Sequence, residues 1–122
     1  MKIIKIEDLP LMPNPHGVEA RKVYENDNVE VMYIILKPGE HLTKHQLPVD
    51  VFFFISEGSG IIEMGNEERE VSKNTLIEGP ANVPRGWRNN TNELLKILVV
   101  KTSKPTQQEK REAISEINKA KQ

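Results

Sequence analysis

Between residues 18 and 103 the chain is a succession of short apolar runs, each ended by residues that favour turns. The breaks recur about every 8–12 residues, which is typical of an antiparallel sandwich or barrel. This spacing predicts an all-β fold. The predicted strands are Glu19–Tyr24, Val29–Leu36, Leu42–His45, Val51–Ile55, Gly60–Met64, Glu68–Val71, Thr75–Ile77 and Leu94–Lys101.

Both ends of the chain differ from this β pattern. We expect an N-terminal arm over residues 1–17, in which Ile3–Ile6 could form a short strand before three prolines interrupt regular structure. Thr106 and Glu109 form a capping box, and apolar residues then recur at helical spacing. The sequence therefore predicts a β-barrel over residues 18–104 and a C-terminal α-helix over residues 105–122.

Two predicted strands, Val51–Ile55 and Leu94–Val100, are nearly apolar on both faces. In an antiparallel protein this means that both faces are covered. One face would line the barrel interior, and the other would pack within the chain or against a second subunit. Phe52, Phe53 and Phe54 make a homodimer contact plausible, so we expect a homodimer.

Composition limits the classes of partner. The chain has 122 residues, which suits one domain, and no cysteine, which excludes disulfides and thiolate metal sites. Its 17 basic and 18 acidic residues are well mixed, so we expect neither a nucleic-acid nor a membrane partner. The N-terminal residues show no signal-peptide core and no apolar run is long enough to span a membrane, so we expect a cytoplasmic protein.

Two segments about forty residues apart, one with Gly39, His45 and Gly58 and the other with Pro80 and Asn89, resemble the two motifs of the cupin superfamily. The first cupin motif starts and ends with glycine and carries two histidines and a glutamate. Here Gly39 and Gly58 stand at the glycine positions and His45 at the first histidine, but Leu47 and Val51 replace the second histidine and the glutamate.

The second cupin motif carries two glycines, a proline, a histidine and an asparagine. Pro80 and Asn89 match, Asn74 and Asn82 stand at the glycines, and Arg85 replaces the histidine. Asparagine tolerates left-handed backbone almost as well as glycine does, so the turns can be kept. The resemblance implies a double-stranded β-helix, or jelly-roll barrel, commonly found as a dimer.

The four metal-ligand positions of such a protein are occupied here by His45, Leu47, Val51 and Arg85. A catalytic metal needs about three protein ligands, and a fixed positive charge opposes a cation. We therefore expect no cofactor. A rebuilt divalent-metal site remains the alternative, with His41 and His45 on one face of a regular strand and Asp50 or Glu40 nearby. Otherwise His41 is an ordinary histidine at the barrel rim.

Strand alternation should place Arg85, Trp87 and Asn89 inside the barrel, across from Phe53 and its neighbours. Apolar walls with a few polar groups are typical of a small-molecule pocket, and an arginine there suits a carboxylate or a phosphate. As the alternative, Arg85 reaches the barrel mouth and pairs with Glu78. The expected ligand-binding residues are His45, Arg85, Trp87, Asn89, His41 and Phe53.

Three functions follow from these residues. The favoured one is a metal-free protein that binds a small, anionic organic molecule. The second is an enzyme, either a metal-dependent oxygenase or isomerase, or a metal-free isomerase or epimerase. In the metal-free enzyme His45 would work with a tyrosine, and Tyr33 could enter the barrel. The third is a structural module with a filled interior. The basic residues near the C-terminus, Lys101, Lys104, Lys110 and Arg111, are interpreted as a solvated face.

Overall fold

A computed structural model describes residues 1–103 and 105–121. Nine strands and two helices are assigned in this part of the chain. They are η1 (Ile6–Asp8), β1 (Glu19–Glu25), β2 (Glu30–Leu36), β3 (His41–His45), β4 (Val51–Glu57), β5 (Ser59–Met64), β6 (Glu67–Ser72), β7 (Leu76–Gly79), β8 (Arg85–Arg88), β9 (Leu95–Lys101) and α1 (Gln107–Ala120).

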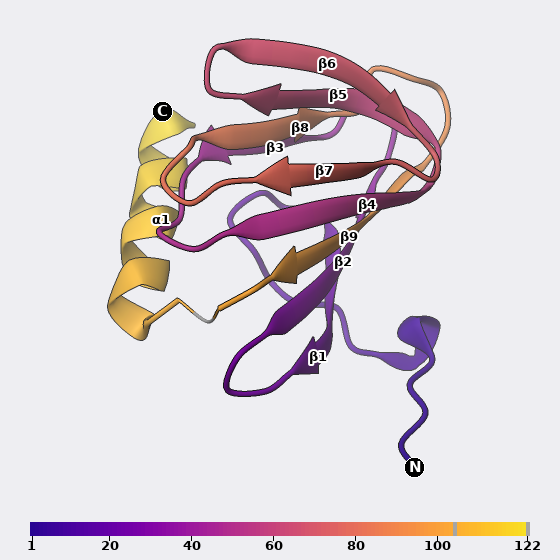
Figure 1. The fold of residues 1–122 in the computed structure, drawn as a ribbon. Helices are drawn as coiled ribbons and strands as arrows, with labels where there is room; N and C mark the ends of the chain where they lie inside the picture. The colour runs from indigo at the N-terminus through magenta and orange to yellow at the C-terminus, as the bar shows by residue number, and fades with distance from the viewer. Residues whose placement is uncertain (104, 122) are drawn as a thin grey trace.

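The described strands form two antiparallel sheets that pack against each other (Figure 1). One sheet has the strand order β1-β2-β9-β4-β7 and the other β3-β8-β5-β6. Strand β9 lies between β2 and β4, so segments far apart in the sequence are hydrogen-bonded neighbours. Buried residues of both sheets, among them Phe53 of β4 and Trp87 of β8, share one core. The predicted all-β jelly roll with a C-terminal helix is confirmed.

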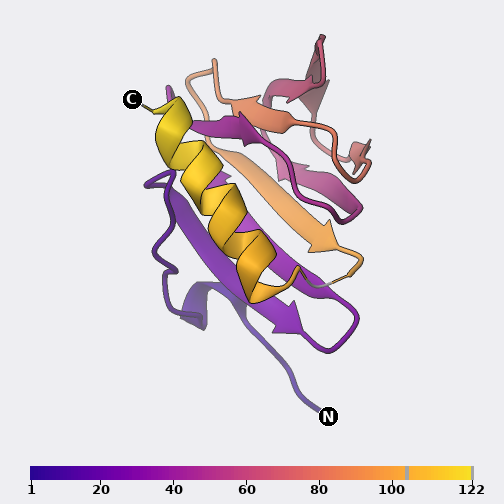
Figure 2. The same ribbon diagram turned by 90° about the vertical axis from the view of Figure 1, so that its left-hand side faces the viewer.

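Helix α1 lies across one end of the two sheets (Figure 2). Thr106 caps its first turn, and the Glu109 side chain accepts from the Thr106 backbone N–H in return, as the capping box predicts. The helix buries Ala113 and Ile117. The predicted boundary at Lys104 and the final residue Gln122 lie outside the described residues. Among the described helices, none combines the length and apolar character that crossing a membrane requires.

Two local predictions need correction. Residues 1–5 form no strand, and the three-residue helix η1 follows them. Strand β8 was absent from the predicted runs, because Arg85–Arg88 contains a single apolar residue, Trp87. By contrast, Asn74 and Asn82 have φ angles of 66° and 63°, which confirms that asparagine takes the left-handed turns at these positions.

The outer face of the five-stranded sheet is apolar over three adjacent strands. Tyr33 on β2, Leu98 on β9 and Phe54 on β4 stand in one row, with Val31, Val100 and Phe52 in the next. Tyr33 therefore lies outside the interior, where its hydroxyl is 3.4 Å from Ser56 Oγ. The possibility that Tyr33 enters the barrel and works with His45 in a metal-free enzyme is therefore not met. A homodimer through this face stays a prediction.

Candidate ligand-binding site

A cavity of about 260 Å³ lies between the two sheets, with α1 and the end of the N-terminal arm along its outer side. Its walls are mostly apolar, with Met32, Phe53 and Val99 from one sheet and Leu42 from the other. A liquid water occupies about 30 Å³, so the cavity has room for on the order of ten non-hydrogen atoms. The interior is therefore not filled with side chains. This contradicts the structural-module hypothesis, which required a filled interior.

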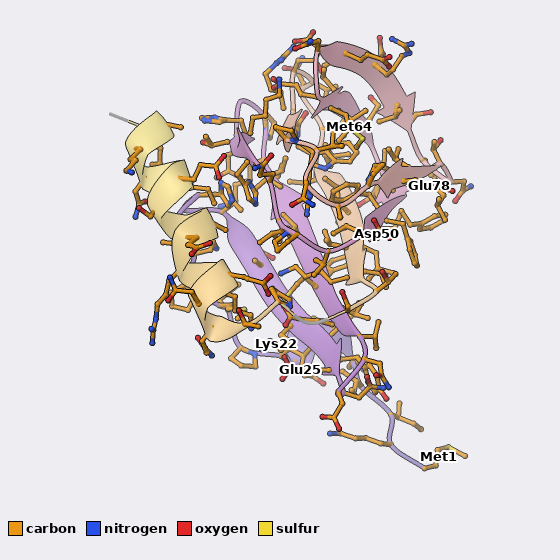
Figure 3. The ribbon with its side chains drawn as sticks, turned by 60° about the vertical axis from the view of Figure 1, so that its left-hand side comes forward. Met1, Lys22, Glu25, Asp50, Met64 and Glu78 are labelled. Carbon is orange, nitrogen blue, oxygen red and sulfur yellow. The ribbon has the colours of Figure 1, made fainter. Side chains whose placement is uncertain are left out.

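Arg85 is a buried arginine without an acidic partner in the described part of the chain. It lines the cavity and is 4% exposed. Its Nη1 atom has no hydrogen-bond partner, and within residues 1–103 and 105–121 it forms no ion pair. Burial lowers the pKa of Arg85 below its usual value, because water no longer solvates the charge. The alternative pair with Glu78 is not formed, since Glu78 is exposed on the side away from α1 (Figure 3).

Trp87 follows Arg85 by two residues on β8 and also lines the cavity. Its ring packs edge-on against Phe53, with the ring centroids 5.5 Å apart, so it links the two sheets. The indole Nε1–H is buried without a hydrogen-bond acceptor. Trp87 thus offers a second unused donor beside Arg85.

His45 lines the cavity next to His16, a residue of the N-terminal arm, with ring centroids 5.5 Å apart. The backbone of one residue, Thr43, fixes both rings. The Thr43 N–H donates to His16 Nδ1 at 3.2 Å, and the Thr43 carbonyl accepts from His45 Nδ1 at 2.9 Å. His45 therefore keeps an unprotonated Nε2, whereas His16 carries its proton on Nε2. The pair presents one acceptor nitrogen and one donor nitrogen.

Burial is the main cause that lowers the pKa of both histidines. For His16 the pKa falls from 6.5 to about 4, with smaller contributions from His45, Lys121 and His41. For His45 burial lowers the pKa, the Thr43 hydrogen bond raises it, and the charge of Arg85 lowers it again. Both imidazoles are therefore neutral near pH 7.

Acid should destabilise the protein through His16. Because the unfolded chain binds this proton near pH 6.5 and the folded chain only near pH 4, the free energy of unfolding should fall as the pH drops between these values. His16→Gln keeps an acceptor for the Thr43 N–H but does not titrate, so its stability should fall less. Urea unfolding at about pH 7 and about pH 5 measures both slopes. His41→Gln, at an exposed position, is the control, and equal slopes for wild type and His16→Gln would contradict the prediction.

A bulge in β3 decides which histidine faces the cavity. Leu42 pairs with Trp87 and His45 with Arg85, so three steps on β3 oppose two steps on β8. Gly86 makes the bulge possible, because a Cβ there would lie 2.7 Å from the Leu42 carbonyl oxygen. The extra residue reverses the alternation. The prediction that His41 and His45 share a face is therefore wrong: His41 is exposed and lies in a separate surface groove.

Asn89 does not line the cavity, contrary to the predicted alternation. It follows the end of β8, and its side chain turns into the adjoining loops. Its Nδ2 donates to the Leu36 carbonyl at 2.9 Å and to the Glu93 carbonyl at 2.7 Å. Its Oδ1 accepts from the backbone N–H and the hydroxyl of Thr91. All its hydrogen-bonding groups are occupied, so Asn89 holds the loop after β8.

The residues in the cavity do not fit a metal. His45, Leu47, Val51 and Arg85 meet there, but only His45 offers a ligand atom. The neighbouring His16 already uses Nδ1 as a hydrogen-bond acceptor. In the described ranges, no three His, Asp or Glu side chains cluster as a metal site would require. The rebuilt site with His41 and Asp50 or Glu40 lacks the shared face on which it depended.

Three charged residues line the cavity at positions that were not among the predicted site residues. Glu30 and Lys101 line it from the neighbouring strands β2 and β9, and Lys110 lines it from α1. The prediction of a solvated face is wrong for Lys101 and Lys110, which line the cavity. Strand alternation could have predicted Glu30 in the interior, because Glu30 shares its strand face with Met32 and Ile34. A charge on the inward face of an apolar strand marks a polar site in the interior.

Residues 32–101 match the Cupin domain family, and the chain belongs to this family. The sequence matches no curated protein. Solved structures with the same fold include TT1209 from Thermus thermophilus, with 24% identity, 86% of this chain and 100% of that chain covered and a TM-score of 0.73. The polyketide cyclase RemF from Streptomyces resistomycificus has 18% identity, coverage of 86% and 81% and a TM-score of 0.77. KdgF from Halomonas sp. has 15% identity, coverage of 85% and 96% and a TM-score of 0.74. At these identities the likeness concerns the fold alone.

Proposed function

We propose that this cupin binds a small organic carboxylate in the cavity, with Arg85 as the residue that holds the carboxylate group. The buried guanidinium, which has no ion-pair partner among the described residues, carries this proposal. A charge removed from water costs stability unless a counter-charge compensates it. A bound carboxylate would supply that counter-charge through two parallel hydrogen bonds.

A carboxylate suits the cavity better than a phosphate does. A phosphate group carries about −1.5 to −2 charges and three acceptor oxygens. The free donors that support this proposal are Arg85 Nη1 and Trp87 Nε1, while His45 is neutral and presents an acceptor. The apolar walls favour a hydrocarbon body behind the charged group.

The test compares hexanoate, hexan-1-ol and inorganic phosphate by isothermal titration calorimetry. We expect saturable binding of hexanoate, with a Kd on the order of millimolar for so small a ligand. Hexan-1-ol lacks the charge, and phosphate lacks the apolar body, so both should bind more weakly. Arg85→Gln removes the charge and should weaken hexanoate binding at least about tenfold.

Arg88→Gln is the matched control, because Arg88 lies on the same strand but pairs with Glu63 and Glu68 outside the cavity. It should bind hexanoate as wild type does. Phosphate binding more tightly than hexanoate would overturn the choice of carboxylate. Unchanged hexanoate binding by Arg85→Gln would overturn the site itself.

A further inference from the structure

Glu30 is a buried carboxylate in which one oxygen has no hydrogen bond. It is 3% exposed and lies on the cavity wall at the start of β2. Its Oε1 accepts a hydrogen bond from Lys101 Nζ at 3.2 Å. Its Oε2 is buried without a hydrogen bond, although Lys110 Nζ of α1 stands 3.5 Å away as an ion pair. The cavity wall thus contains an acceptor that has an ion-pair neighbour but no hydrogen bond.

In residues 1–103 and 105–121, three side-chain atoms are buried without a hydrogen bond, and each belongs to a residue that lines this cavity. Arg85 Nη1 and Trp87 Nε1 are donors from β8, and Glu30 Oε2 is an acceptor from β2 in the facing sheet. Buried polar atoms are nearly always paired, so three exceptions around one space indicate missing partners. The complementary molecule has an acceptor toward β8 and a donor toward β2.

The charges around Glu30 determine which kind of hydrogen-bond donor a ligand can present to it. Lys101 and Lys110 already face this carboxylate, and burial together with the charges of Lys110 and Arg85 lowers the pKa of Lys101. A ligand ammonium group would add another cation to this group. A second ligand carboxylate would meet the negative charge of Glu30. A neutral hydroxyl donates a hydrogen bond without changing the charge.

We infer that the ligand is a hydroxycarboxylate, with its carboxylate on Arg85 and its hydroxyl donating to Glu30 Oε2. This inference rests on the proposed function, because the Arg85 contact places the molecule in the cavity. An apolar body joins the two groups. The whole molecule has on the order of ten non-hydrogen atoms, as the cavity volume allows.

The test uses matched ligands that differ in the terminal group alone. Each ω-hydroxy acid from 4-hydroxybutanoate to 8-hydroxyoctanoate is titrated beside its unsubstituted parent acid, with calorimetric detection. At the chain length that spans the cavity, the hydroxyl should tighten binding about tenfold, as expected for a hydrogen bond to a charged group. The ω-amino acid and the dicarboxylate of that length should bind no more tightly than the parent acid.

Glu30→Gln identifies the contact, because it keeps the side-chain shape and removes the charge. It should reduce the hydroxyl preference to less than about threefold. Glu70→Gln, at an exposed position on β6, is the matched control and should keep the full preference. Should Glu30→Gln fail to fold, the ligand ranking on the wild-type protein decides the question.

The outcomes separate the two proposals. Parent and hydroxy acids that bind equally at every length, through an Arg85-dependent site, would overturn the hydroxycarboxylate and leave the carboxylate site standing. Tighter binding of the ω-amino acid or the dicarboxylate would also overturn it. Absence of binding by every member, or binding unaffected by Arg85→Gln, would overturn both. A hydroxyl preference that Glu30→Gln leaves intact would overturn the assigned contact.

Discussion

Arg85→Met should give a protein that is more stable than wild type and no longer binds carboxylates. The side chain is 4% exposed and its charge has no partner in the described chain, so an apolar side chain of similar length removes a desolvation cost. Replacing buried charges by apolar groups often raises stability by roughly 1–4 kcal/mol. Loss of the charge-assisted bonds should weaken hexanoate binding on the order of a hundredfold. Urea unfolding and calorimetry measure the two effects.

Arg88→Met separates this effect from the general loss of an arginine on β8. Arg88 is partly exposed and pairs with Glu63 and Glu68, each at 2.9 Å. Its replacement should leave stability equal or slightly lower and carboxylate binding unchanged. An Arg85→Met protein less stable than wild type would mean that the guanidinium is compensated in the empty protein, and the argument for a missing anion would fail.

Gly58→Ala should be among the most destabilising single substitutions in the chain. Gly58 has a φ angle of +83°, and a Cβ at this position would lie 2.1 Å from the Leu94 carbonyl oxygen. The side chain would therefore meet both an unfavourable backbone conformation and a fixed backbone atom. Strain and overpacking each cost about 1–3 kcal/mol, so we expect a loss of about 3 kcal/mol or more in urea unfolding.

Gly39→Ala provides the control for the conformational part alone. Gly39 has nearly the same φ angle, +84°, but a Cβ there meets nothing within 4 Å. Its replacement should cost about 1–2 kcal/mol, the penalty for left-handed backbone. Equal losses for the two variants would show that the chain between β4 and β5 moves aside easily, contrary to the tight approach seen at Leu94.

The sequence predicted the fold well because the fold depends on local signals that reinforce one another. The turn residues and apolar runs predicted eight of the nine assigned strands, and the Thr106 capping box predicted where α1 begins. Asn74 and Asn82 take left-handed conformations, as their place in the motif predicted. Each of these features depends on a few neighbouring residues, which a single sequence displays directly.

The site was harder to predict, because its geometry depends on one inserted residue. Period-two alternation is reliable only along an uninterrupted strand, and the bulge between Leu42 and His45 reverses it. The His41 side chain therefore lies on the protein surface, whereas the His45 side chain lines the cavity. The prediction for Asn89 is wrong for a related reason. Strand β8 ends at Arg88, so strand alternation no longer determines where the Asn89 side chain points.

The other features of the site that the sequence did not predict are contacts between distant segments. His16 reaches His45 through a hydrogen bond to Thr43, which is 27 residues away in the chain. No local pattern indicates that the arm folds back over the sheets. The pairing of Glu30 with Lys101 also spans the chain, although the inward face of each strand could have revealed both charges. Arg85 could be predicted from the sequence, because it stands at the histidine position of the second cupin motif.

Helix α1 has a kinetic consequence for any molecule that uses the cavity. Ala113, Ile114 and Ile117 border the space, Lys110 is paired with Glu30, and the Lys121 ammonium donates to the Pro15 carbonyl of the arm. We expect a ligand that enters beside α1 to displace these contacts, so its association should be slower than the diffusion limit.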